Sequence, residues 1–353
     1  MDLNTVDMTI TAIHNGYRQQ AFTPAELIEA LLQRCDLYAD NPIWITRLSR
    51  EQIQPYLQRL QSHSPDSLPL YGIPFAVKDN IDLAAIPTTA ACVAFSYTPT
   101  EDAFVVAQLL QAGAIPLGKT NMDQFATGLV GVRSPYGVCQ NSFNPDYIAG
   151  GSSSGSAVAV ALGLVSFALG TDTAGSGRVP AAFNNIIGLK PSKGLLSTQG
   201  VVPACRSLDC VSIFALTTDD AHQVLEVAAQ FDAKDAFARP NRDTNRRNYG
   251  ILPSPKFRFA IPQPQQLEFF ANNDAAALFT ATVEQLQALG GEVECVDFKP
   301  FLQAAQLLYE GPWVAERRIA TQGVNPDALL PVIRRILASQ ADANAEKLFQ
   351  AQF

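Results

Sequence analysis

The middle of the chain carries two serine-bearing loops, GGSSSGS at 150–156 and GTDTAGSGR at 170–178. Glycine and serine in such runs let backbone N–H groups approach a ligand closely, although the same residues also suit flexible loops without a role. Between the loops, 156–164 (SAVAVALGL) predicts a closely packed helix of small residues, and 165–169 (VSFAL) predicts a buried strand. This arrangement indicates an α/β domain.

Segments on both sides continue the alternation of strands and helices. Thr23-Pro24-Ala25-Glu26 is a capping box with proline at the first helical position, and it predicts the start of an amphipathic helix. LYGIPFAV at 70–77 predicts a buried strand that ends at Lys78. The remaining pattern predicts helices at 101–111, 219–231 and 274–289, strands at 114–117, 257–261 and 293–298, and a polar loop or linker at 232–255.

One motif in the first loop points to a different catalytic class. Residues 151–155 match the G-x-S-x-G nucleophile elbow of α/β-hydrolases, and Asp209 and His222 follow in the order that such a triad requires. However, an elbow must directly follow a strand, whereas 144–149 (NPDYIA) is typical of a turn. His222 also falls inside a predicted helix. We therefore disfavour this interpretation.

Taken together with Lys78, the two loops resemble the catalytic motifs of the amidase-signature family, whose hallmark is a Ser-Ser-Lys triad. Ser152 and Ser176 are 24 positions apart, as that pattern requires, and VKDN at 77–80 and GKTNM at 118–122 match two further family blocks. The resemblance extends from about residue 24 to 216 and continues more weakly to the end. It implies a mixed, mostly parallel central sheet covered by helices on both faces. It also implies that Ser176 is the nucleophile and that Ser152, on a cis peptide bond, is a proton bridge to Lys78.

The chemistry of these residues is consistent with that implication. A serine hydroxyl needs a base, but an ordinary lysine is only about one part in 10³ neutral at pH 7. Burial at the end of an apolar strand would lower the pKa of Lys78, whereas the plainer alternative is a surface lysine paired with Asp79. Asp172 and Arg178 are expected to hold the loop. The backbone N–H groups predicted to form the oxyanion hole are those of Thr173, Ala174, Gly175 and Ser176.

Two longer strings narrow the resemblance within the family. TDTAGSGRVPAAFNNIIGLKPSKG at 171–194 and QFATGLVGVRSPYG at 124–137 are most similar to allophanate hydrolases, which release ammonia from the terminal amide of allophanate (urea-1-carboxylate). A small, planar, anionic substrate calls for a guanidinium clamp. The resemblance implies that Tyr309, Arg317 and Gly128 bind it. The alternative for Arg317 is an exposed, charged helix face.

Two other functions remain open at the level of sequence. One is the glutamine-hydrolysing A subunit of an amidotransferase, and the other is a non-catalytic homologue. Amidase-signature domains usually continue further than this chain, which ends at Phe353 in a polar helical stretch. We therefore expect 1–353 to be a single amidase-signature domain that lacks its C-terminal part.

Composition restricts the partners and the redox chemistry. The net charge of −8 gives no footprint for nucleic acid or an anionic membrane surface, and no apolar stretch reaches the roughly 18 residues of a membrane span. The N-terminus, MDLNTVDMTI, lacks the features of a secretory signal, so we expect a cytoplasmic protein. The six cysteines lack metal or redox spacing and are expected to be reduced.

The resemblance completes these expectations. It implies neither a metal ion nor a cofactor, allows a homodimer, and suggests a functional link to a biotin-dependent urea carboxylase.

Overall fold

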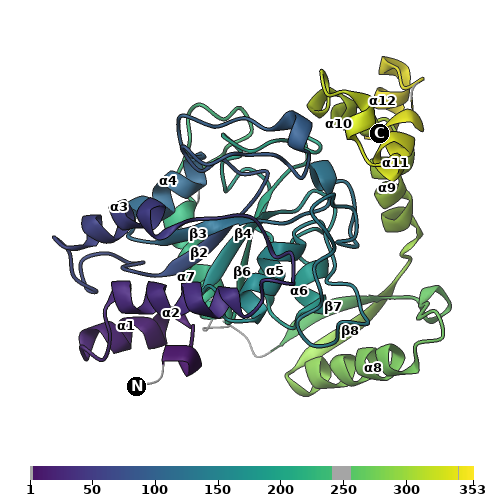
Figure 1. Ribbon diagram of the computed structural model, residues 1–353. Helices are drawn as coiled ribbons and strands as arrows, with labels where there is room; N and C mark the ends of the chain where they lie inside the picture. Colours follow the sequence, from purple (N-terminus) through teal and green to yellow (C-terminus); the bar gives the residue numbers. More distant parts are fainter. Residues whose placement is uncertain (1–2, 241–255, 341) are drawn as a thin grey trace. The chain divides into compact units, whose positions relative to one another are not determined.

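A six-stranded sheet forms the centre of the larger of two compact units (Figure 1). The computed structural model describes residues 3–240, 256–340 and 342–353. The first unit comprises Met1–Arg242 and Trp313–Ala343, and the second comprises Asp243–Pro312 and Asn344–Phe353. In order across the sheet, the strands are β1 (Trp44–Arg47), β3 (Ile115–Thr120), β2 (Pro74–Lys78), β4 (Phe167–Thr171), β6 (Val211–Ala215) and β5 (Ile187–Leu189).

The strand directions confirm the predicted sheet type. Strand β2 lies between β3 and β4 and is parallel to both, while β1 and β6 are antiparallel to their inner neighbours and β5 is antiparallel to β6. Four strands, β2 to β5, therefore point one way, and the other two point the opposite way. The sheet is mixed and mostly parallel.

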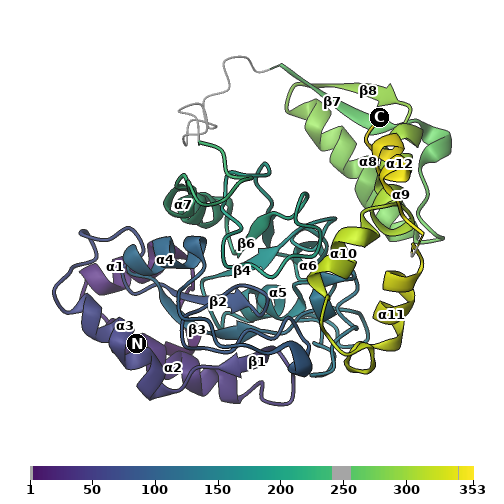
Figure 2. The same cartoon turned by 90° about the horizontal axis from the view of Figure 1, so that it is seen from above.

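Helices cover both faces of this sheet (Figure 2). Helix α5 (Ser154–Ala161) packs against β2, β3, β4 and β6, with α6 (Val179–Phe183) on the same side. On the other side lie α4 (Phe104–Gln111), which contacts α7 (Thr218–Ala228), and α3 (Arg50–Leu60). The other helices among the described residues of this unit are α1 (Ile10–Arg18), α2 (Pro24–Asp36), α10 (Val314–Ala320), α11 (Pro331–Ala338) and the 3-10 helices η1 (Leu3–Thr5), η2 (Val93–Phe95), η3 (Gln124–Ala126) and η6 (Pro326–Ala328).

The central strands form because their side chains are apolar on both faces. Every residue of β2 and β4 is buried, as expected for inner strands sandwiched between helices. The rings of Phe75 and Phe167 stack across these strands with centroids 5.1 Å apart. This apolar centre holds the end of β2, and so Lys78, in a fixed place.

The N-terminal capping box is confirmed. Thr23 accepts a hydrogen bond from the backbone of Glu26, whose side chain in turn accepts one from the backbone of Thr23. Helix α2 is amphipathic, as predicted, and its buried apolar face comprises Leu27, Ile28, Leu31, Leu32 and Cys35. All six cysteines are free thiols.

The second unit contains the predicted β-α-β succession. Strands β7 (Phe257–Pro262) and β8 (Gly291–Val296) are parallel and are joined through α8 (Asn273–Ala288). The described part of this unit also contains helices α9 (Lys299–Glu310) and α12 (Ala345–Gln352) and the 3-10 helix η5 (Pro264–Gln266). Most of the predicted linker, 241–255, lies outside the described residues.

Several boundaries differ from the predicted ones. The strand expected from Leu70 begins at Pro74, because the backbone turns at Gly72 with a φ of 67°. The helix expected from residue 101 begins at Phe104. The pattern also missed β1, β5 and β6, which are short strands of three to five residues.

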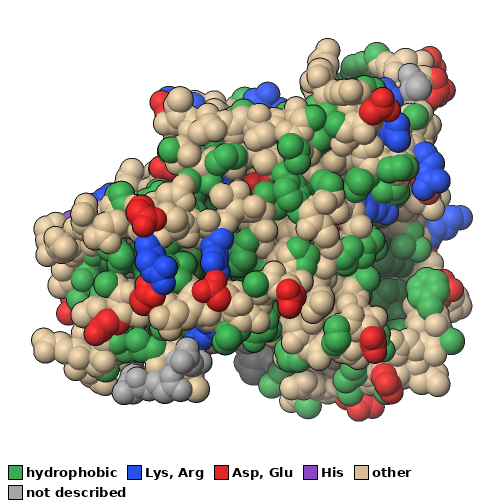
Figure 3. Space-filling model, in the orientation of Figure 1, with side chains coloured by type: hydrophobic (Ala, Val, Ile, Leu, Met, Phe, Trp, Pro, Cys, Tyr) green, Lys and Arg blue, Asp and Glu red, His purple; other side chains and the backbone are tan. Residues whose placement is uncertain are grey.

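Surface features agree with the composition. On the face shown in Figure 3, Lys and Arg side chains lie among Asp and Glu side chains rather than in one continuous basic block. Arg50, for example, pairs with Glu29 at 2.5 Å and Arg47 with Asp36 at 2.7 Å. None of the helices in the described ranges is long and apolar enough to cross a membrane.

Candidate active site

Lys78 occupies the C-terminal end of β2 and is fully buried. Its Nζ donates to Ser152 Oγ and to Thr171 Oγ1, each at 2.8 Å. The alternative of a surface lysine paired with Asp79 is wrong, because the nearest cation to the Asp79 carboxylate is Lys119, whose Nζ lies 3.7 Å from Oδ1. The structure therefore places an amine directly against one of the two predicted serines.

Burial lowers the pKa of Lys78 to about 7. The nearby charges of Asp123, Asp172 and Asp209 act in the opposite direction, but they are weaker than the desolvation. About half of the Lys78 side chains are therefore neutral at pH 7, whereas an ordinary lysine is almost entirely charged. A neutral amine with a hydroxyl at hydrogen-bond distance is equipped to accept a proton.

This pKa predicts the pH dependence of activity. Because only neutral Lys78 can act as the base, kcat/KM is expected to rise with pH through an acid limb near pH 7 and to level off above it. Initial rates measured from pH 5 to 9 would check this. A profile whose acid limb lies near pH 4, where carboxylates titrate, would exclude Lys78 as the base.

Ser152 lies at the start of the loop that leads into α5. The peptide bond between Gly151 and Ser152 is cis, as the family resemblance implied. The side chain of Ser152 is fully buried against Lys78, and its carbonyl accepts a hydrogen bond from the N–H of Asp123 at 3.0 Å. The position of its hydroxyl is thus fixed from two sides.

Ser176 lies in the loop between β4 and α6 and is 3% exposed. Its Oγ donates to the carbonyl of Gly128 at 3.4 Å, and no hydrogen bond between Ser176 and Ser152 is recorded among the described residues. Asp172 holds the loop, because its carboxylate accepts from Gly177 N–H and from the Arg178 guanidinium, each at 3.0 Å. The structural role predicted for Asp172 and Arg178 is confirmed.

The turn before Ser176 has the features expected of an oxyanion hole. Within the described part of the chain, the backbone N–H groups of Thr173, Ala174, Gly175 and Ser176 have no recorded hydrogen-bond acceptor. The Thr173 side chain is anchored by Asp209 at 2.5 Å. These N–H groups remain available to a ligand, and their role stays a prediction.

Arg317 is brought next to this loop although it is distant in sequence. It lies in α10 and is only 2% exposed, so the alternative of an exposed helix face is wrong. Its Nη1 donates to Thr127 Oγ1 at 3.0 Å, one residue before Gly128, whose carbonyl accepts from Ser176. Two of the three predicted substrate-binding residues, Arg317 and Gly128, therefore lie close to Ser176, the predicted nucleophile.

Tyr309, the third predicted contact, belongs to the second unit. It lies near the end of α9 and is half-buried. Its contact with substrate stays a prediction.

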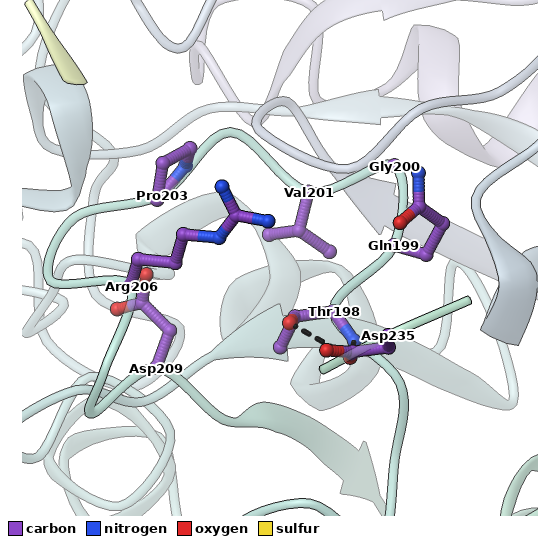
Figure 4. Close-up of a pocket in the computed structure, with 8 residues that line it drawn as sticks. All are labelled: Thr198, Gln199, Gly200, Val201, Pro203, Arg206, Asp209 and Asp235. Carbon is purple, nitrogen blue, oxygen red and sulfur yellow. Dashed lines mark hydrogen bonds between the residues drawn. The ribbon is translucent and has the colours of Figure 1, made fainter. Parts of the chain in front are cut away.

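A polar pocket of about 180 Å³ adjoins the loop 170–178, which Asp209 contacts through Thr173 (Figure 4). Asp209, which anchors Thr173, lies on one side of it, and Asp235, which accepts from Thr198, lies on the other. Arg206 extends its guanidinium toward Val201. The pocket is lined by Thr198, Gln199, Gly200, Val201, Pro203, Arg206, Asp209 and Asp235.

The α/β-hydrolase alternative fails on geometry. Ser153, the serine of the G-x-S-x-G match, donates to the carbonyl of Thr171 inside the fold. His222 lies on α7 and contacts Glu226 at 3.1 Å, while Asp209 is occupied by Thr173 and two backbone N–H groups. Each member of the supposed triad therefore contacts other residues, and none of these contacts joins two members of the triad.

Sequence reasoning missed two polar contacts of the lysine site. Thr171 accepts from Lys78, and Asn80 donates to Thr171 Oγ1 at 3.3 Å and to the carbonyl of Val202 at 3.2 Å. Both residues stand inside motifs that were already noted, at 77–80 and 170–178. The signal was present, but their roles depend on which side chains meet across β2 and β4.

A buried lysine against a serine, with a second serine on a strand–loop–helix turn, is the arrangement expected of a serine hydrolase site that does not use histidine. The model of the Amidase family matches residues 26–352, and the chain therefore belongs to the amidase family.

Similar proteins refine this placement. The chain is 50% identical to urea amidolyase of Saccharomyces cerevisiae over 299 residues. The aligned region covers 84% of this chain and 16% of that protein. It superposes on the structure of Kluyveromyces lactis allophanate hydrolase with a TM-score of 0.89 and 42% identity, covering 98% of this chain and 56% of the other. It is also 36% identical over 278 residues to the A subunit of glutamyl-tRNA(Gln) amidotransferase from Chlorobium phaeobacteroides, covering 77% of this chain and 58% of the other. The chain thus spans a sixth to about half of these relatives.

Proposed function

We propose that this chain hydrolyses the terminal amide of allophanate and releases ammonia. The observation that carries the proposal is the buried guanidinium of Arg317, which is held beside Thr127 and Gly128 next to the serine nucleophile. A guanidinium binds a planar carboxylate well, and allophanate presents one at the end opposite its amide. The similarity to urea amidolyase and allophanate hydrolase supports the same substrate.

The proposed mechanism uses only the chain's own residues. Neutral Lys78 accepts a proton from Ser152, which accepts one from Ser176 as its Oγ attacks the amide carbon. The oxyanion that forms accepts hydrogen bonds from the N–H groups at 173–176. Lys78 then returns the proton, through Ser152, to the departing nitrogen, the C–N bond breaks, and ammonia leaves. Water attacks the acyl ester of Ser176 in the same way and regenerates the enzyme.

The wider setting follows from the same similarity. We expect both compact units to belong to one amidase-signature domain, since the family match runs through both of them. A link to a biotin-dependent urea carboxylase fits the much longer urea amidolyase relatives. A cytoplasmic location and a homodimer stay part of this proposal. Native mass spectrometry would settle the oligomeric state.

An ammonia-release assay tests the function directly. The chain is expected to release ammonia from allophanate faster than from biuret, malonamate or glutamine. Ser176→Ala is expected to lose on the order of 10³-fold or more of that activity because the covalent step is lost. Circular dichroism of the variant provides the folding control. Full activity in Ser176→Ala would overturn the mechanism.

The amidotransferase relatives make glutamine the informative competitor. Ammonia release from glutamine but not from allophanate would favour the glutamine-hydrolysing component of an amidotransferase. The non-catalytic alternative predicts a folded chain whose Ser176 does not react with a fluorophosphonate, a reagent that labels activated serines.

A further inference from the structure

Asp123 is a fully buried carboxylate between β3 and η3 that the proposed mechanism does not use. Its backbone N–H donates to the carbonyl of Ser152 at 3.0 Å. Its side chain faces the opposite segment: Oδ2 accepts from Gly131 N–H at 3.0 Å and Oδ1 from Arg133 N–H at 2.8 Å. One residue therefore joins the Ser152 loop to the segment 128–133.

Close packing makes this junction specific. A Cβ on Gly151 would lie 2.3 Å from Asp123 Oδ2, and a Cβ on Gly128 would lie 2.8 Å from the same atom. The carboxylate thus packs closely against two glycines, each of which is next to one of the catalytic serines. Gly151 precedes Ser152 in the chain, and the carbonyl of Gly128 accepts a hydrogen bond from Ser176. The N–H of Gly151 also donates to the carbonyl of Leu129 at 2.8 Å, which ties the two segments together a second time.

The charge of Asp123 acts on the same site. Of the carboxylates that favour protonated Lys78, it has the largest effect, ahead of Asp172 and Asp209. Asp172 is paired with Arg178, and Asp209 accepts from Thr173 and two backbone N–H groups. Burial raises the pKa of the Asp123 carboxyl. The hydrogen bonds from the two backbone N–H groups and the charges of Arg133 and Lys78 act in the opposite direction and favour the carboxylate. In the buried site, a negative charge near Lys78 stabilises the ammonium that forms when Ser176 is deprotonated.

We propose that Asp123 is a positioning residue for the catalytic serines. Its backbone and carboxylate fix the distance between the Ser152 loop and the Gly128 carbonyl, and its charge stabilises the ammonium of Lys78. The mechanistic part rests on the proposed Ser-Ser-Lys mechanism but not on allophanate as the substrate.

Fluorophosphonate labelling of Ser176 tests this inference, because the labelling rate reports the activation of the nucleophile whatever the natural substrate is. Asp123→Asn removes the charge and places an N–H₂ group against one of two backbone donors. We expect its maximal labelling rate to fall on the order of 10²-fold and its acid limb to move to lower pH. Asp220→Asn is the matched control. Asp220 is also buried and accepts from the backbone N–H of Ile10, but it is not among the charges acting on Lys78. This control should keep the rate and the acid limb of the unchanged protein.

A second variant separates position from charge and serves if Asp123→Asn does not fold. Asp123→Glu keeps the charge but displaces the carboxylate from Gly131 and Arg133. Its acid limb should stay in place while its maximal rate falls. A wild-type labelling rate in Asp123→Glu, or an unchanged rate and acid limb in a folded Asp123→Asn, would overturn the proposal. Labelling that follows these expectations in a chain inactive on allophanate would sustain the role of Asp123 and refute only the substrate.

Discussion

Lys78→Met is expected to lower the rate of amide hydrolysis by on the order of 10³-fold or more while raising the free energy of unfolding at pH 7. The loss follows from the contact between Nζ and Ser152 Oγ at 2.8 Å, since methionine cannot accept the proton. The gain in stability follows from burial, because a chain of similar volume without a charge does not need to be desolvated. After allowance for the hydroxyl partners that are lost, the gain should be about 1–2 kcal/mol.

The pH dependence of this gain has a definite sign. The pKa of Lys78 is lowered from 10.5 to about 7 by folding, so between these values the unfolded chain binds more protons than the folded one. The stability of the unchanged protein therefore rises with pH across this window, and the cost of the buried charge is fully present below pH 7. The advantage of Lys78→Met should be largest below pH 7 and should decline by about 1.4 kcal/mol per pH unit above it. It should therefore become a disadvantage well before pH 10.5, because the lost hydroxyl partners then outweigh the removed charge. Urea unfolding at pH 6, 8 and 10 measures it.

Lys119→Met provides the matched control for Lys78→Met. Lys119 is equally buried and lies on the neighbouring strand, but it faces the carboxylate of Asp79 at 3.7 Å. Its removal leaves Asp79 buried without its cation, so this variant should be destabilised by about 3 kcal/mol or more. If both methionine variants were destabilised alike at pH 6, the proposed cost of burying Lys78 would be wrong.

Gly155→Ala is expected to destabilise the protein by about 3 kcal/mol, although alanine is the better helix former by about 1 kcal/mol. Gly155 lies in the first turn of α5. A Cβ there would come within 2.3 Å of the carbonyl oxygen of Ile43 and 2.6 Å of the backbone nitrogen of Asn121. These atoms are joined by a hydrogen bond of 2.8 Å, so neither can move away cheaply. Activity should fall as well, because α5 begins two residues after Ser152.

Urea unfolding of a variant with the reverse substitution in the same helix separates the effect of helix propensity from that of the close backbone contacts. Ala161→Gly at the last position of α5, which is only half-buried, should cost at most about 1 kcal/mol through helix propensity. If Gly155→Ala instead raised the free energy of unfolding by as much as Ala161→Gly lowers it, close backbone packing would not be the reason for glycine at position 155.

The sequence predicted best those features that depend on local pattern. The runs at 74–77 and 167–169 are apolar on both faces, so inner strands followed from composition alone. The capping box fixed the start of α2, and the two loops identified Ser152 and Ser176 through their resemblance to a family.

What could not be predicted depends on contacts across the sheet. Lys78 and Thr171 are 93 positions apart, and they meet only because β2 and β4 are neighbours. Arg317 carries the same charge as Arg318 next to it, but only the packing of α10 decides which of the two is buried. Strand β5 has only three residues, too few to show a period, and β5 and β6 find their places by pairing with each other and with β4.

The path of the chain through the first unit has a consequence for biosynthesis. Lys78, Ser152 and Ser176 all precede residue 242, whereas Arg317 belongs to a segment that rejoins the unit only after 70 residues of the other unit. Its contact with Thr127 spans 190 positions. Because a ribosome delivers the chain from its N-terminus, the serines and the lysine emerge before the arginine proposed to bind the substrate carboxylate. The three residues proposed to carry out catalysis are thus present on the nascent polypeptide before the residue proposed to select the substrate has been translated.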